Sequence, residues 1–252
     1  MTNRRALLPT IAIVVAATAS ACGRADAVAS FTDEPLIAEP ARISPAAPDA
    51  AVPSLPAAAA SVRAATLEFV RTRLDAREPG GAPVRETFIR TARRVSLRSQ
   101  SERGEWLFVR NPVAPDRVSG AFADHRSRVV VEHEDTDLLI ALGLRGWADV
   151  IAFRVDPAAL GAMRRTGRTT RIAGLEFDQF VATTEGDGLA EIWWNADELI
   201  AGDTVTRLGG QRTRTRLTTV TWEAPAEALE LLTRRFPAYA VRGPKDDWHA
   251  HR

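Results

Sequence analysis

The sequence predicts a domain of the α+β class, built on a largely antiparallel sheet with helices on one of its faces. From about residue 61 onward, short segments rich in β-branched and aromatic residues alternate with Gly-rich or polar turns. Connections this short suit hairpins and exclude parallel crossovers. Helical patterns are grouped in the middle of the chain and near its end, which favours a layer of helices over one sheet face.

The strand pattern recurs in nine segments, each ended by a turn signal. The predicted strand segments are 65–76, 84–99, 105–112, 116–123, 127–134, 170–183, 189–196, 203–208 and 212–222.

Three regions are predicted to be helical. A helix is expected over 156–168, where Asp-Pro supplies the N-cap and the first helical position, and arginines and a glycine mark the end. Residues 136–154 are expected to hold one or two short helices broken at their glycines. The segment 225–236 repeats the pattern of proline first and arginine last.

The amino terminus has the pattern of an export signal. Arg4 and Arg5 form a positive n-region, and the apolar run that follows is too short and too weak to span a bilayer permanently. Small residues at 19–21 then precede Cys22, the only cysteine of the chain. Residues 1–21 are therefore predicted to be a signal peptide, with the general secretory route as the default and a twin-arginine route as the alternative.

The sequence around Cys22 resembles the lipobox of bacterial lipoproteins. The resemblance implies that the thiol of Cys22 is joined to diacylglycerol before cleavage makes this residue the new amino terminus. Ala19 stands where the lipobox prefers leucine, and an ordinary secretory cleavage beside an incidental cysteine is the alternative. Gly23 follows the cysteine where aspartate would favour inner-membrane retention, so we expect a lipid anchor on the periplasmic face of the outer membrane.

Residues 22–60 are predicted to form a tether between the lipid and the folded domain. Alanine and proline dominate this segment, and apolar periodicity is almost absent. Repeated proline removes backbone donors and favours extended polyproline conformations. The folded domain is therefore expected over residues 61–252, as a monomer.

Composition and motifs exclude several function classes. With 33 basic and 32 acidic residues the net charge is +1, so nucleic acid is not expected as a partner. A single cysteine excludes an internal disulfide framework and Cys-rich metal sites. The chain lacks a G-x-S-x-G elbow, a P-loop, an H-E-x-x-H motif and a dinucleotide fingerprint. We expect a binding protein without cofactor or metal, and an exported hydrolase is the less favoured alternative.

Three polar clusters have a simpler explanation than chemistry. Segment 131–137 offers a histidine among carboxylates, but strand alternation sends the histidine to the opposite face, and the last three residues suit a helix cap. His249 and His251 have no further metal ligands nearby. The basic cluster 164–171 could meet phosphate-bearing lipid head groups, but a solvated helix end is the simpler interpretation.

The order of the elements carries a second resemblance. Antiparallel strands, a helical insertion, and then the stretch RIAGLEFDQFVATTEGDGLAEIWWNADELIAGDTVTRLGG (171–210) resemble the outer-membrane lipoprotein carrier and sorting superfamily (LolA-like). The resemblance covers about residues 61–252. It implies an open half-barrel covered by helices, whose concave apolar surface holds acyl chains, other hydrophobic ligands or another envelope protein. Relatives with this fold serve as carriers, lipoprotein acceptors or stress sensors, so the fold alone does not select a function.

A curled sheet needs apolar side chains on its inner face, and these are the candidates for lining a ligand pocket. A packed core without a ligand is the alternative, because alternation assigns faces only relative to an unknown register. Trp193 and Trp194 are adjacent, so one of them must leave the core. The predicted lining residues are Phe69, Phe88, Trp106, Phe108, Leu175, Phe177, Ile192 and Trp194.

Together these patterns predict a cell-envelope lipoprotein whose half-barrel binds a hydrophobic ligand, such as an acyl chain, or a lipidated partner. The alternative is an envelope sensor or accessory protein that uses the same fold for contact with another protein. An apolar cavity open to solvent would favour the first hypothesis, and a closed interior would favour the second.

The lipid anchor can be tested directly. Replacing Cys22→Ser should abolish incorporation of labelled palmitate and release the protein from the membrane fraction, because a thioether to the lipid cannot form on serine. Labelling of the variant to the level of the unaltered protein would show that the lipobox interpretation is wrong.

Overall fold

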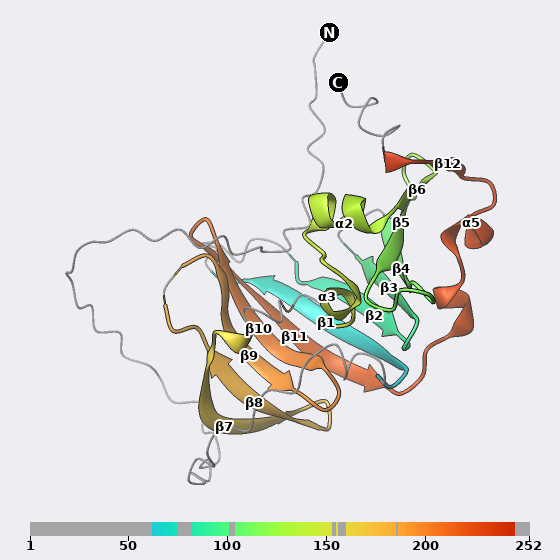
Figure 1. Cartoon of the computed structure of the whole chain (residues 1–252). Helices are drawn as coiled ribbons and strands as arrows, with labels where there is room; N and C mark the ends of the chain where they lie inside the picture. The colour runs from blue at the N-terminus through green and yellow to red at the C-terminus, as the bar shows by residue number, and fades with distance from the viewer. Residues whose placement is uncertain are drawn as a thin grey trace.

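The computed structural model describes residues 62–74, 82–100, 104–152, 155, 160–184 and 186–244. The predicted signal peptide, Cys22, the tether and the two carboxyl-terminal histidines lie outside these ranges. Within them, one curved sheet of twelve strands is flanked by short helices (Figure 1). The sheet is not closed, so the predicted α+β open half-barrel is confirmed.

The structure has strands in every segment predicted from the sequence, but it divides 84–99 into two strands, adds a strand that begins at Arg164, and adds a short one near the carboxyl end. The strands are β1 (Ala65–Arg73), β2 (Val84–Arg90), β3 (Arg94–Ser99), β4 (Gly104–Arg110), β5 (Val118–Asp124), β6 (Val129–His133), β7 (Arg164–Ile172), β8 (Leu175–Val181), β9 (Gly188–Asn195), β10 (Ile200–Leu208), β11 (Gln211–Thr221) and β12 (Ala240–Arg242). The helical elements are α2 (Asp135–Leu142), α3 (Trp147–Ile151), the 3-10 helix η1 (Ala226–Leu229) and α5 (Leu232–Arg235).

Most consecutive strands are neighbours in the sheet, but one connection joins strands near its two opposite edges. The order is β12-β6-β5-β4-β3-β2-β1-β11-β10-β9-β8-β7, and all pairs are antiparallel except β12 with β6. The strands β6 and β7 follow each other in sequence but lie near the two opposite edges. The connection between them carries α2 and α3 over one face of the sheet, which we call the inner face (Figure 1).

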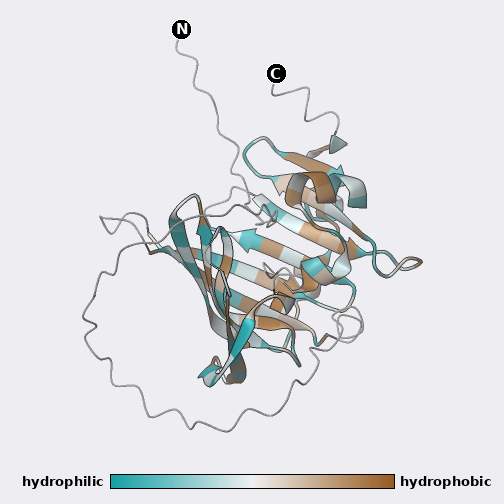
Figure 2. Cartoon of the chain, turned by 60° about the vertical axis from the view of Figure 1, so that its left-hand side comes forward, coloured by the Kyte–Doolittle hydropathy of each residue, from teal (hydrophilic) through white to brown (hydrophobic). Residues whose placement is uncertain are grey.

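The inner face holds most of the hydrophobic core. At Gly120 of β5, an added Cβ would lie 3.0 Å from Leu138 of α2 and 3.2 Å from Phe108 of β4, so the helix packs closely on the sheet at this glycine. The buried cluster includes side chains of β1, β2, β4 and β8–β11 together with Trp147 and Ile151 of α3. Figure 2 shows hydrophobic residues as bands across the strands and along the helices.

The outer face is covered over β2–β6 by the carboxyl-terminal segment. A second hydrophobic cluster joins η1 and α5 to these strands. The buried carboxylate of Glu105 on β4 forms an ion pair with Arg235 of α5 at 2.9 Å and another with Arg98. Phe236 stacks on Tyr239 and meets the ring of His125 edge-on. These contacts bring the chain to β12, which pairs with the edge of β6.

Two of the three helical predictions need correction. Residues 164–168 of the predicted helix 156–168 belong to β7, because this stretch pairs with β8 and closes a hairpin with it. The predicted helix 225–236 is divided into η1 and α5 by extended backbone at Glu230 and Leu231. The third prediction is confirmed, since α2 ends at Gly143, which has a left-handed φ of 69°, and α3 begins after Gly146.

A buried arginine connects β2 with the turn between β9 and β10. Arg90 is fully buried, and its guanidinium donates hydrogen bonds to the carbonyls of Leu199 (3.1 Å) and Glu198 (2.6 Å). Leu199 has a φ of 50°, a left-handed conformation that is costly for leucine. Burial lowers the pKa of Arg90 to about 10, and the carboxylate of Glu198, 3.8 Å away, acts in the opposite direction. Arg90 therefore remains charged at neutral pH and holds the strained turn.

Replacing Arg90→Met should lower the free energy of unfolding by about 3–5 kcal/mol, since the turn carbonyls lose their donors and the carboxylate of Glu198 loses its partner. Urea denaturation followed by circular dichroism measures this change. Arg93→Met is the matched control, because Arg93 is exposed. Equal stability of the two variants would show that the turn does not depend on Arg90.

Candidate functional site

The register places six of the eight predicted lining residues on the inner face. On one side of the sheet, Phe180 pairs with Ile192, and Ile192 pairs with Thr204, which pairs with Thr215 of β11. Leu217 shares the face of Thr215 and pairs with a residue of β1. The six residues on this face are Phe69, Phe88, Trp106, Phe108, Ile192 and Trp194.

These six side chains are covered rather than open to solvent. Their exposed fractions lie between 0% and 6%, and they belong to one cluster with side chains of the helix layer. Leu138, Trp147 and Ile151 of that layer are themselves at most 1% exposed. Six of the predicted residues therefore share one apolar face, and the protein's own helices pack against it.

The other two predicted lining residues lie on the opposite side of their strand. Phe177 and Leu175 alternate with Phe180 along β8, so they do not share the inner face. Phe177 is 1% exposed and packs close to Gly202, where an added Cβ would lie 2.8 Å from its ring. Ile172 reaches the same glycine, which leaves no room for a larger side chain. Phe177 is therefore a packing residue at the sheet's β7–β10 end.

Trp193 and Trp194 point to opposite faces, as the alternation predicts. Trp194 is 2% exposed in the inner core, while Trp193 is half-buried on the outer face, opposite Gln179 and Asp203. Asp203 is 4% exposed there and accepts two hydrogen bonds from Arg214 at 2.9 Å and one at 2.6 Å. This half of the outer face is therefore polar, in contrast to the half under the carboxyl-terminal segment.

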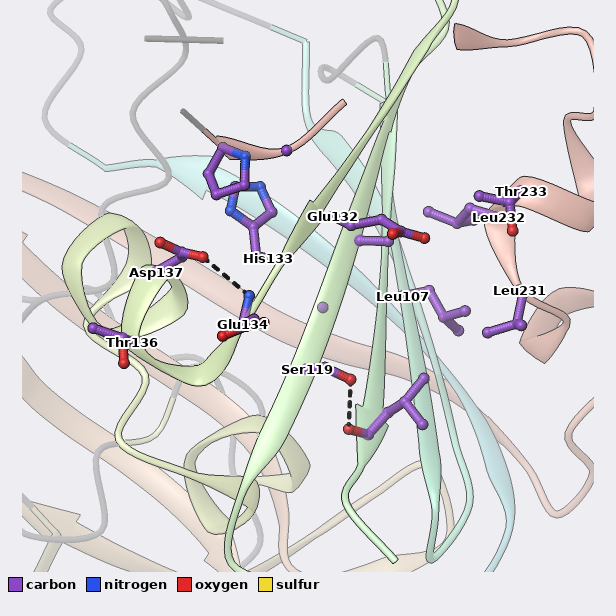
Figure 3. A pocket seen from close by; sticks show the side chains of 15 residues that line it. Leu107, Ser119, Glu132, His133, Glu134, Thr136, Asp137, Leu231, Leu232 and Thr233 are labelled. Atoms are coloured by element: carbon purple, nitrogen blue, oxygen red, sulfur yellow. Dashed lines mark hydrogen bonds between the residues drawn. The ribbon is translucent and has the colours of Figure 1, made fainter. Parts of the chain in front are cut away.

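A hollow of about 810 Å³ lies beside the end of β6, and we call it the strap groove because the carboxyl-terminal segment forms one wall (Figure 3). The edge of β6 is paired with β12 only as far as Val131. The groove begins at the next residue. It is lined by Leu107, Val109, Ser119, Gly120, Ala121, Glu132, His133, Glu134, Thr136, Asp137, Leu231, Leu232, Thr233, Gly243 and Pro244.

The strap groove has an apolar floor and an acidic rim. Leu107 and Leu232 are buried beneath it, while Leu231 remains 38% exposed. Glu132 and Glu134 are exposed, and neither forms an ion pair with another residue of the described ranges. Figure 3 shows Glu132 on the side of the leucines and His133 on the side of α2.

The groove does not assemble a catalytic group from these polar side chains. Asp137 accepts the backbone N–H of Glu134 at 3.1 Å in a capping box, so its predicted capping role is confirmed, although the N-cap residue is Glu134. His133 packs its ring against Trp106 with centroids 5.4 Å apart, on the other face from Glu132. Among the residues that the structure describes, no group of three or more His, Cys, Asp or Glu could hold a metal ion.

The strap groove was not predicted, although the sequence contains a signal for it. Residues 106–109 of β4 are all apolar, and an unbroken apolar run in a strand indicates that both of its faces are covered. The second cover is the carboxyl-terminal segment, which the sequence predicted only as a helix.

No protein-family model and no curated protein matches this sequence. Three solved structures show partial similarity. The MucA/MucB complex from Pseudomonas aeruginosa aligns with a TM-score of 0.39 and 16% identity, over 66% of this chain and 54% of that chain. PNGF-II aligns with a TM-score of 0.42 and 10% identity, over 75% of this chain and 33% of that chain. A DUF1329 family protein from Desulfovibrio piger aligns with a TM-score of 0.31 and 7% identity, over 72% of this chain and 92% of that chain.

The chain thus spans about half of the matched MucB chain and a third of PNGF-II. TM-scores below 0.5 at these identities establish no shared function.

Proposed function

We propose that this chain is a non-enzymatic accessory lipoprotein of the cell envelope that contacts another polypeptide, and that it does not carry a lipid in its interior. The observation that carries the proposal is the filled inner face. Six of the predicted lining residues are at most 6% exposed and belong to one buried cluster with residues of α2 and α3. A dry, closed interior is what the protein-contact hypothesis requires.

The energy of the inner core argues against an acyl chain at this position. To enter, a ligand would have to displace Leu138, Trp147 and Ile151, which are almost completely buried. Each such side chain contributes about 1.5–3 kcal/mol by its burial. An acyl chain would have to offset the loss of the whole helix layer before any net binding appeared.

The strap groove is the surface that we assign to the partner. Its apolar floor suits an apolar side chain, and its exposed glutamates suit basic residues beside that side chain. The backbone of β6 beyond Val131 is not covered by β12, so an extended segment could also reach it. We therefore expect a partner segment in which apolar and basic residues are adjacent.

The envelope location rests on the amino-terminal sequence, which lies outside the described residues. In the described ranges no helix is long and apolar enough to cross a membrane. We propose attachment through the lipid on Cys22, with residues 22–60 as the tether and the domain on the periplasmic face of the outer membrane.

A fluorescent fatty-acyl probe distinguishes the two hypotheses. We expect no saturable binding of the probe to the mature protein at micromolar concentration, because the inner face offers no free apolar surface. Fluorescence titration measures this. Saturable binding that a non-fluorescent fatty acid displaces would show that the carrier hypothesis is correct and the proposed function wrong.

A charge on the inner face should unfold the domain rather than alter a ligand site. We expect Phe88→Asp to lower the free energy of unfolding by more than about 4 kcal/mol, since Phe88 is 1% exposed. Leu208→Asp is the control, because Leu208 is 48% exposed at a strand end. A Phe88→Asp variant that melts like the control would indicate an open, solvated inner face.

A further inference from the structure

Within the described residues, the edge strand β7 leaves one of its sides without a neighbouring strand. It is the last strand in the sheet order, and within the described ranges it pairs only with β8. Nine residues form the strand, and most of their side chains are exposed. An edge of this kind carries backbone donors and acceptors that can pair with another chain.

The hairpin turn determines which backbone groups point outward. The two turn residues Ala173 and Gly174 both have positive φ, 48° and 84°, as a type I′ hairpin turn requires. In such a hairpin the flanking residues Ile172 and Leu175 form a hydrogen-bonded pair, and such pairs alternate along the ladder. Thr169 and Arg171 therefore direct their backbone N–H and C=O groups away from β8.

Two arginines on this strand converge on a second hollow, of about 360 Å³. Arg164 and Arg168 line it together with Thr166 and Gln179. The polar floor is held in place, because the Thr166 hydroxyl donates to the Gln179 side-chain oxygen at 2.9 Å and accepts the backbone N–H of Arg168 at 3.2 Å. Gln179 in turn donates to Glu191 at 2.8 Å.

The edge has an excess of positive charge. Arg165 is neutralised by Asp178 at 2.7 Å. The guanidinium groups of Arg164, Arg168 and Arg171 form no ion pair with another described residue. Guanidinium groups bind carboxylates with two parallel hydrogen bonds, so this arrangement suits an anionic partner.

Arginines and a bulge are also the means by which sheets avoid pairing with their own copies. The register of β7 shifts between Arg165 and Thr169, and Gly167 lies there with a φ of 78°. Two copies of the edge would bring like charges together. The same charges attract an acidic strand, so they select the partner rather than excluding every partner.

We propose that β7 is a docking edge for an acidic, extended polypeptide segment, which pairs with Thr169–Ile172 and places carboxylates against Arg164 and Arg168. This rests on the proposed function only in that the partner is a polypeptide. The outward backbone groups favour a polypeptide over a lipid head group, because a phosphate uses the arginines but has no strand to pair with the edge.

Fluorescence anisotropy of a labelled peptide in which glutamate alternates with valine tests the docking edge on the mature full-length protein. We expect saturable binding that weakens as salt is added and no binding of the same peptide with lysine for glutamate. The double variant Arg164→Glu/Arg168→Glu should weaken binding about tenfold or more. The matched control Arg93→Glu/Arg234→Glu makes the same charge change at exposed arginines outside β7, and its affinity should stay near that of the unaltered protein.

Strand pairing is tested separately from charge. Thr169→Pro keeps every arginine but removes an outward N–H, so peptide binding should fall about tenfold while the thermal melt of the protein stays close to normal. If that variant does not fold, a peptide N-methylated at alternate residues makes the same test from the other side. Normal binding of the methylated peptide would overturn the docking edge. Binding of phosphatidylglycerol vesicles would overturn it too, if Arg164→Glu/Arg168→Glu abolishes that binding and Thr169→Pro preserves it. Saturable acyl-probe binding would contradict the proposed function and leave this peptide measurement unaffected.

Discussion

The fold depends on one topological constraint, which is that β6 and β7 follow each other in sequence but lie near opposite edges of the sheet. The chain between them must cross a whole face, and its apolar helices cover the side chains that would otherwise line an open half-barrel. The interior is therefore filled by the connection itself. Any ligand on this face would have to compete with a segment that is covalently held at both ends.

The second crossing, on the outer face, sets a limit on where partners can bind. The carboxyl-terminal segment covers β2–β6 and is held by an ion pair between Arg235 and the buried Glu105. Glu105 also pairs with Arg98, so loss of Glu105 would leave two arginines without this partner. The pairing of β12 with β6 ends at Val131, before the end of β6. The strap groove is the space that remains between these elements, so its shape follows from the length of β12.

The sequence predicted the strands well, because alternation and turn residues are local signals. It failed at 164–168, where arginine, threonine and glycine fit a helix end as well as a strand, and pairing with β8 decided the outcome. Six of the eight predicted lining residues share one apolar face, but Phe177 lies on the other side of its strand, since the side depends on cross-strand register. The apolar run 106–109 indicates cover on both faces of β4, but it does not give the position of the strap groove, whose walls come from strands, a helix start and a carboxyl-terminal segment brought together by the fold.

The strap groove and the β7 edge differ in charge as well as in position. Among the residues that the structure describes, the groove has glutamates and the edge has arginines that form no ion pair, and β6 and β7 are separated by ten strand intervals in the sheet order. At about 4.8 Å per interval, this is roughly 48 Å along the curved sheet. A segment of one charge sign cannot complement both surfaces. We therefore propose that the two surfaces bind either two partners or two oppositely charged segments of one partner.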